Sequence, residues 1–144
     1  MKMTNQEYND YVGRHAPRSS SRRNYLFAFL IGGAICCLGQ LFSDVYGFLG
    51  LSEETAATAS TVTLVFIGAM LTAAGIYDDV AKLAGAGTLV PITGFANAVA
   101  APALEFRTEG LIFGTAAKMF VIAGPVIVFG TTAGVVYGLI LCLF

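Results

Sequence analysis

Charged residues are scarce in this chain, and tryptophan is absent. Asp, Glu, Lys and Arg make up 12% of its 144 residues, and hydrophobic residues make up 56%. A soluble domain carries about 25% charged residues. The mean hydropathy of +0.75 agrees with this imbalance. The scarcity of charge excludes an ordinary soluble domain and indicates a membrane protein.

Side chains suited to catalysis or metal binding are also few. The three cysteines, Cys36, Cys37 and Cys142, lie in apolar runs, and the single histidine, His15, lies in the polar N-terminal part. The sequence shows no zinc-binding spacing, no disulfide framework and no pairing of a nucleophile with a base. We therefore expect no enzyme activity, no metal site and no cofactor.

The basic residues are distributed unevenly, although the net charge is only −1. Five of the eight lie in the first 23 positions: Lys2, Arg14, Arg18, Arg22 and Arg23. Cytoplasmic segments of membrane proteins carry such an excess of Lys and Arg. The pattern predicts a cytoplasmic, polar and basic tail over residues 1–24, followed by a single membrane domain over 25–144, and it disfavours a nucleic-acid surface.

Four runs without charge divide the rest of the chain: 24–43, 55–77, 83–104 and 119–144. Each is long enough to cross the bilayer, because a helix needs about 20 residues to span about 30 Å of hydrocarbon. We expect an all-α integral membrane protein with three or four transmembrane helices. The expected elements are helices at about 25–43 and 55–77, a broken segment at 83–104, a short segment at 110–117 and a helix at 119–143.

The third run differs from the others because glycine and proline interrupt it. Glycine gives the backbone freedom, and proline removes a hydrogen-bond donor. Broken backbone at membrane depth must be buried in protein or line a watery cavity, and such segments often form solute sites in transporters. The candidate pore or gate residues are Gly85, Gly87, Pro91, Thr93, Gly94 and Asn97. For Thr93 and Asn97, two interpretations remain open: lining a path, or satisfying backbone groups freed by the break.

Two topologies are compatible with this broken segment. If the segment crosses the membrane, Arg107 and Lys118 lie outside the cytoplasm. If the segment is re-entrant, all eight basic residues stay cytoplasmic, and the positive-inside rule favours this topology. In the re-entrant form, four candidate carboxylates would reach one mouth and concentrate cations there: Asp78, Asp79, Glu105 and Glu109. Ordinary solvation of helix ends is the alternative role for these carboxylates.

Glycines recur every fourth residue in the last run, at Gly130, Gly134 and Gly138. Residues at this spacing share one face of a helix, and small residues there let a second helix approach closely. The spacing predicts a helix-packing face.

Three blocks of sequence resemble a known family: FLIGGAICCLGQ at 29–40, LTAAGIYDDVAKLAGAGTLVPITGFANAVAAPALEFRTEG at 71–110 and MFVIAGPVIVFG at 119–130. They are similar to the stage V sporulation protein A membrane proteins of endospore-forming bacteria, in particular the closely similar AC and AEB subunits. The long polar tail before the first run is more like that of the AC members.

The resemblance implies a channel subunit in the inner membrane of the forespore and spore. Such a channel moves dipicolinic acid, chelated with calcium, inward during sporulation and outward at germination, and it responds to membrane tension. The implied partners are the lipid bilayer, further copies of the chain or a sister AEB-type membrane subunit, and a soluble dipicolinate-binding AD-type subunit. A non-conducting scaffold within the same complex is the alternative function.

Overall fold

The computed structural model describes residues 4–15 and 21–143, and these residues form helices and no strand. Three helical segments are long and apolar enough to cross a membrane: Arg22–Phe48, Glu53–Ala73 and Leu111–Leu143. The predicted all-α membrane fold is therefore confirmed. Parts of the predicted N-terminal tail, residues 1–3 and 16–20, lie outside the described residues.

The N-terminal half contains a tail helix and an antiparallel pair of long helices. Its elements are α1 (Asn5–His15), α2 (Ser21–Phe48) and α3 (Glu53–Ala73). The helix α1, which the sequence analysis did not predict, begins with a capping box: the Thr4 backbone N–H donates to the Glu7 carboxylate at 2.8 Å, and the Glu7 N–H lies 3.4 Å from the Thr4 hydroxyl.

Both ends of α2 lie beyond the predicted bounds of 25–43. At the C-terminal end the helix passes through Asp44, whose carboxylate accepts a hydrogen bond from the Gln40 amide one turn earlier at 2.8 Å. This i,i+4 pair allows a charged residue inside the helix. The interruption of the hydrophobic run at Asp44 therefore did not mark the helix end.

The helix α3 is shorter than the predicted 55–77. It begins after Ser52, whose hydroxyl accepts from the Thr55 N–H, and it ends at Ala73. Gly75 then adopts a left-handed φ of 73°, which glycine tolerates best, and the chain turns into α4 (Ile76–Ala84). The last residues assigned to a spanning helix thus belong to a separate short helix.

The segment predicted to be broken consists of two helices, α5 (Ala86–Leu89) and α6 (Ile92–Glu105). Gly85, with φ of 52°, separates α4 from α5, and Pro91, with an extended ψ of 161°, separates α5 from α6. The predicted short segment at 110–117 is a π-helical turn, Leu111–Ala116, that continues without interruption into α7 (Ala117–Leu143). A 3-10 turn at Arg107–Glu109 connects α6 to it.

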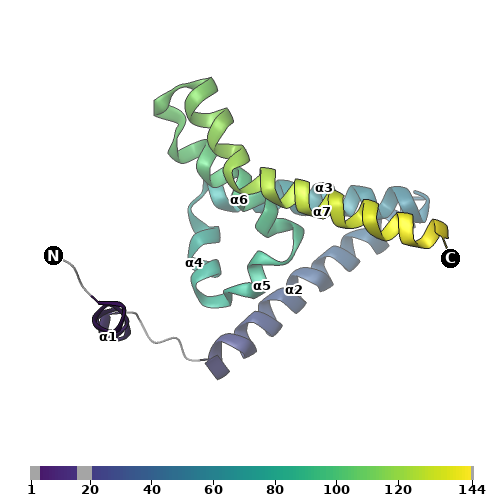
Figure 1. Cartoon of the computed structure of the whole chain (residues 1–144). Coiled ribbons are helices and arrows are strands. Elements are labelled where there is room, and N and C mark those ends of the chain that lie inside the picture. Colours follow the sequence, from purple (N-terminus) through teal and green to yellow (C-terminus); the bar gives the residue numbers. More distant parts are fainter. Residues whose placement is uncertain (1–3, 16–20, 144) are drawn as a thin grey trace.

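The helices pack in a fixed order around the broken segment (Figure 1). The helix α2 packs against α3, α4 and α5, whereas α6 packs between α3 and α7. In this view α7 runs from the tip beyond α6 toward the side where α2 and α3 meet. Most large apolar side chains on the long helices are exposed in the single chain, as expected for surfaces that contact lipid or other subunits. In the described chain, the buried residues Tyr77, Ala84, Thr88 and Thr93 lie where α4, α5 and α6 meet α2 and α3, whereas Ala56, Ser60 and Ala123 are buried elsewhere on α3 and α7.

Candidate functional site at the broken segment

Glycines bring α5 directly against the backbone of α2. A Cβ atom on Gly87 would collide with the carbonyl oxygen of Ala28, and a Cβ atom on Gly32 would lie 3.1 Å from the Gly87 carbonyl oxygen. No side chain fits between these two backbones. The sequence therefore docks α5 on α2 through small residues, as membrane helices commonly do.

A similar close approach joins α6 to α3 and closes the turn before α6. A Cβ atom on Gly68 would lie 3.2 Å from the Cα atom of Thr93, and one on Gly94 would collide with the carbonyl oxygen of Thr88. Gly87 and Gly94 are thus required for packing on each side of Pro91. This placement explains why both positions are glycine, and their backbones also border apolar cavities beside Pro91. Their role as pore or gate residues stays a prediction.

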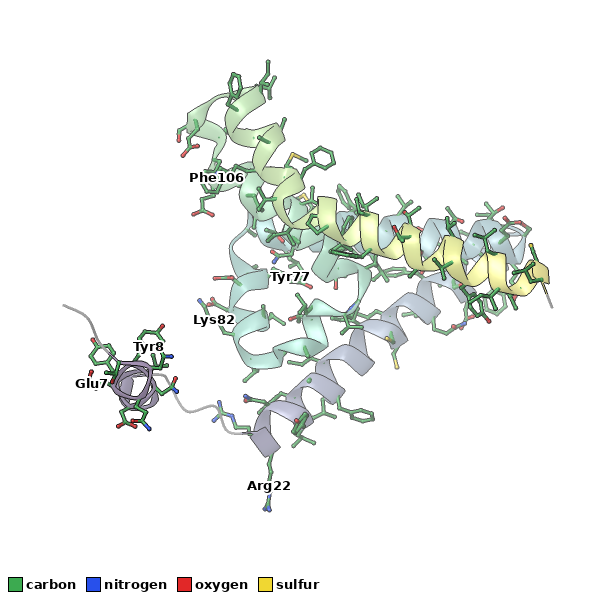
Figure 2. The ribbon with its side chains drawn as sticks, in the orientation of Figure 1. Glu7, Tyr8, Arg22, Tyr77, Lys82 and Phe106 are labelled. Carbon is green, nitrogen blue, oxygen red and sulfur yellow. The ribbon has the colours of Figure 1, made fainter. Side chains whose placement is uncertain are left out.

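Tyr77 lies in the interior between α4 and the broken segment (Figure 2), and it is only 4% exposed. Its hydroxyl donates to the carbonyl oxygen of Thr88 at 2.9 Å and lies 3.1 Å from the hydroxyl oxygen of Thr93. The Thr88 hydroxyl in turn donates to the Gly85 carbonyl oxygen at 3.0 Å. These bonds satisfy polar groups of a non-helical turn that hydrocarbon cannot satisfy.

A second polar contact lies near the C-terminal end of α3. The Thr72 hydroxyl lies 2.8 Å from the Gly68 carbonyl oxygen of its own helix and 2.8 Å from the Asn97 side-chain oxygen on α6. Thr93 therefore lies beside Gly68 and Asn97 beside Thr72. Because the residue numbers of both helices rise in the same direction along these contacts, α6 runs parallel to α3, and its last residues extend beyond the C-terminal end of α3.

A polar cavity of about 320 Å³ opens at this end of the molecule. Its lining residues come from α3, α4 and α6 and are Thr72, Asp78, Asn97, Ala101, Leu104 and Glu105. The start of α4 and the end of α6 therefore meet at one place. Three of the residues selected from the sequence, Asp78, Asn97 and Glu105, share this cavity, and we call the six lining residues the polar mouth.

The other two candidate carboxylates do not line the polar mouth. Asp79 lies 3.1 Å from the Lys82 ammonium on the exposed side of α4, and Asp78 lies 3.4 Å from the same ammonium. The hydrogen bond and charge of Asp79, followed by those of Asp78, raise the pKa of Lys82 above its ordinary value of 10.5. Glu109 lies in the 3-10 turn after α6 and is exposed.

Among the sequence candidates, only Asn97 places a neutral polar side chain on the polar mouth. Gly85 provides the turn after α4. Pro91 lines two apolar cavities, one of which it shares with Gly87 and the other with Gly94. Thr93 is 5% exposed and contacts Tyr77.

Three residues of the site, Tyr77, Thr72 and Thr88, are not among those that the sequence predicts. The signal available for all three was a hydroxyl group close to an apolar run, where it needs a partner.

The predicted helix-packing face is open in the single chain. No atom outside the local helix lies within 4 Å of the Cβ positions of Gly130, Gly134 and Gly138. Within the part of the chain that the structure describes, no group of three or more His, Cys, Asp and Glu side chains is arranged to hold a metal ion.

Two long helices, a broken segment and a third long helix define an all-α integral membrane protein. The family model for the SpoVAC/SpoVAEB sporulation membrane protein matches residues 24–140, so the chain belongs to this family. Stage V sporulation protein AC of Bacillus subtilis (strain 168) is 45% identical over 141 residues, which cover 96% of this chain and 94% of that relative. No solved structure matches the chain. The resemblance found in the three sequence blocks is confirmed, and membership supports a role in sporulation.

Proposed function

We propose that the protein is a subunit of a channel that moves calcium dipicolinate across the inner membrane of the forespore and spore, with opening driven by membrane tension. The observation that carries this proposal is the polar mouth, where Asp78, Asn97 and Glu105 meet beside a break in the membrane domain. A path for a solute needs polar groups within an otherwise apolar domain, and this is where the chain supplies them. The proposal includes no enzymatic step.

The chemistry of the solute fits a mouth of this composition. Calcium and dipicolinate paired one to one have little net charge, so their passage depends on width and on neutral polar groups more than on a strong ring of charge. Asn97 supplies an amide at the inner part of the polar mouth, and the carboxylates of Asp78 and Glu105 supply sites that attract calcium at its rim.

The topology proposed with this function is re-entrant, with the N-terminus in the cytoplasm. The shared cavity of Asp78 and Glu105 supports it, because the chain leaves and returns to the same end of α3 between these residues. All eight basic residues then lie on the cytoplasmic side. The long helices α2, α3 and α7 are the three crossings.

A complete path requires more than one chain. The cavity of about 320 Å³ is bounded by three helices of a single subunit, and the face at Gly130, Gly134 and Gly138 is left open for a neighbour. We therefore propose assembly with further copies or with a sister AEB-type membrane subunit, and cytoplasmic contact with a soluble dipicolinate-binding AD-type subunit.

A non-conducting scaffold in the same complex is the second candidate. It is favoured by the exposure of the rim carboxylates, since the Asp78 side chain is 76% exposed and is available to a soluble partner. In a scaffold, Asp78 and Glu105 would affect docking of that partner and leave solute flux unchanged.

A release assay distinguishes the two functions. Calcium dipicolinate is entrapped in liposomes that hold only the purified protein, and its release is measured. If the protein is a channel, release should rise on osmotic downshift. The Asn97→Leu variant should insert normally but show less release. Gln40→Leu is the matched control, because it makes the same kind of amide replacement on α2, away from the polar mouth. No release from inserted, oligomeric protein would contradict a self-sufficient channel and favour the scaffold.

A further inference from the structure

An apolar groove of about 570 Å³ separates the break at Pro91 from α7. One wall is formed by the α5–α6 turn and α6, and the other by the first half of α7. Its lining includes Val90, Pro91, Phe95 and Ala98 on the first wall and Ile122 and Val126 on the second. Val90 is 85% exposed in the single chain, so the groove is open toward the surroundings of the protein.

A positive charge lies beyond one end of this groove, one helical turn before its lining residue Ile122. Lys118, Ile122 and Val126 recur every fourth residue of α7 and so lie on one face of that helix. The Lys118 ammonium lies 4.3 Å from the centre of the Phe106 ring, just beyond the C-terminal end of α6. Phe106 and Lys118 therefore connect α6 and α7 beyond the groove, near the point where the chain passes from one helix to the other.

Lys118 has no carboxylate partner among the described residues. The ion pairs of the described chain both belong to Lys82, and the contact of Lys118 is the face of an aromatic ring. Its side chain is half-buried. Lys118 lies in the first part of the spanning segment Leu111–Leu143. A lysine near the end of a membrane helix can extend its ammonium to the headgroup level, where the phosphates of anionic lipids are available to it.

We propose that this groove binds one anionic phospholipid, with the lipid phosphate at Lys118 and an acyl chain along the apolar walls. The apolar lining matches the acyl chain, and the single charge at the interfacial end matches the headgroup. A second copy of this chain fits less well, because it would need to present an apolar ridge and a carboxylate together. The site goes beyond the proposed channel, since binding requires no conduction.

The location gives the bound lipid a structural role. Its acyl chain would touch Pro91 at the break, Gly94 on α6, and Ile122 and Val126 on α7. The broken segment already contacts α7 through α6, and the lipid would add a connection between α5 and α7, which do not pack on each other.

The absence of tryptophan from the chain permits a direct test. A single tryptophan introduced as Phe95→Trp reports on the groove, and Phe129→Trp, at a position 74% exposed on α7 and outside the groove lining, is the matched control. Each variant is placed in vesicles that contain either dibrominated phosphatidylglycerol or dibrominated phosphatidylcholine in an otherwise identical unbrominated background. Bromine quenches tryptophan fluorescence only at close contact.

We expect the anionic lipid to be preferred at Phe95→Trp by about fivefold, the ratio that one basic residue near an anionic surface provides. Phe129→Trp should show no such preference. Adding Lys118→Gln should abolish the preference at Phe95→Trp but leave quenching by both lipids, and Lys118→Arg should retain it. A merely structural role of Lys118 would leave the headgroup preference unchanged.

Two results would overturn the proposal. Equal quenching at Phe95→Trp by both brominated lipids would show that Lys118 selects no headgroup. Absence of quenching, together with crosslinking between two chains through cysteines placed at Val90, would show that a second copy fills the groove. Both results are read from binding alone, so a failed release assay on the same vesicles would count only against the channel.

Discussion

The Tyr77 hydroxyl donates a hydrogen bond to the Thr88 carbonyl oxygen at 2.9 Å and thereby connects α4 to α5. The same hydroxyl lies 3.1 Å from the side-chain oxygen of Thr93, on the other side of the break at Pro91. Tyr77 and Thr88 are 4% and 2% exposed, respectively. One phenol therefore holds both arms of the broken segment in place.

Replacement of Tyr77 by phenylalanine should destabilise the broken segment. The Tyr77→Phe variant keeps the ring but removes the donor to a buried carbonyl, which costs about 1–3 kcal/mol. A lower melting temperature in detergent and faster proteolytic cleavage between α4 and α6 are the expected results. Tyr137→Phe is the control, because Tyr137 is 64% exposed on α7. Equal melting temperatures for Tyr77→Phe and the unmodified protein would contradict the assigned role.

The contact between Gly87 and Ala28 predicts a steric effect of a single methyl group. In Gly87→Ala the new Cβ atom meets the Ala28 carbonyl, so α5 must move away from α2, at a cost of about 1–3 kcal/mol. The measurement is thermal unfolding in detergent.

Gly33→Ala is the matched control for Gly87→Ala. It lies on α2 near the same contact, but its Cβ position has no neighbour within 4 Å. Helix propensity favours alanine there by up to about 1 kcal/mol, so this variant should be as stable as the unmodified protein or more stable. Destabilisation of both variants by the same amount would show that the α2–α5 contact is not the cause.

The sequence was sufficient to predict the membrane fold and the place where it breaks. Long charge-free runs depend only on composition, and the cluster of glycines around Pro91 weakens the helix locally. A single proline is a weaker signal, because Pro102 and Pro125 lie inside α6 and α7. Helix ends were predicted less well because local pairs move them. The Gln40–Asp44 hydrogen bond extends α2 past a charge, and the left-handed turn at Gly75 ends α3 before the apolar run does.

The candidate site was only partly predictable, because its contacts join distant parts of the chain. Asp78, Asn97 and Glu105 were selected for their type and position, but their common cavity depends on α6 running beside α3. The partners Thr72 and Tyr77 lie 25 residues from Asn97 and 11 residues from Thr88, respectively. No periodicity in a single segment reports such pairs.

The proposed topology predicts which positions share one side of the membrane. After Cys36, Cys37 and Cys142 are replaced by serine, cysteines at Asp79 and at Glu109 should react with an impermeant thiol reagent from the same side. A cysteine at Glu53, at the start of α3, should react only from the opposite side. Labelling of the Glu109 position together with the Glu53 position would show instead that the broken segment crosses the membrane.

The pKa of Lys82 should fall when its acidic neighbours are neutralised. Asp79→Asn should lower the pKa toward 10.5 more than Asp78→Asn does, because the hydrogen bond and charge of Asp79 contribute most. A raised pKa in the folded state means that the stabilisation is complete below pH 10.5 and is lost as the pH rises through the higher folded value. NMR titration of labelled lysine side chains in detergent measures these shifts. An unchanged Lys82 pKa in Asp79→Asn would contradict the pairing.

A bulky residue on the open glycine face of α7 should affect assembly without affecting the fold of the chain. In Gly134→Leu the new side chain meets no atom of its own chain within 4 Å of the Cβ position, so its melting temperature as a monomer should change little. The side chain would, however, hold a neighbouring helix away, because close approach requires small residues. Light scattering during size-exclusion chromatography should show loss of the oligomer. Val135→Leu adds bulk one residue away on another face, and it should assemble normally. If Gly134→Leu assembled as well as Val135→Leu, subunits would have to meet through a surface other than Gly130, Gly134 and Gly138.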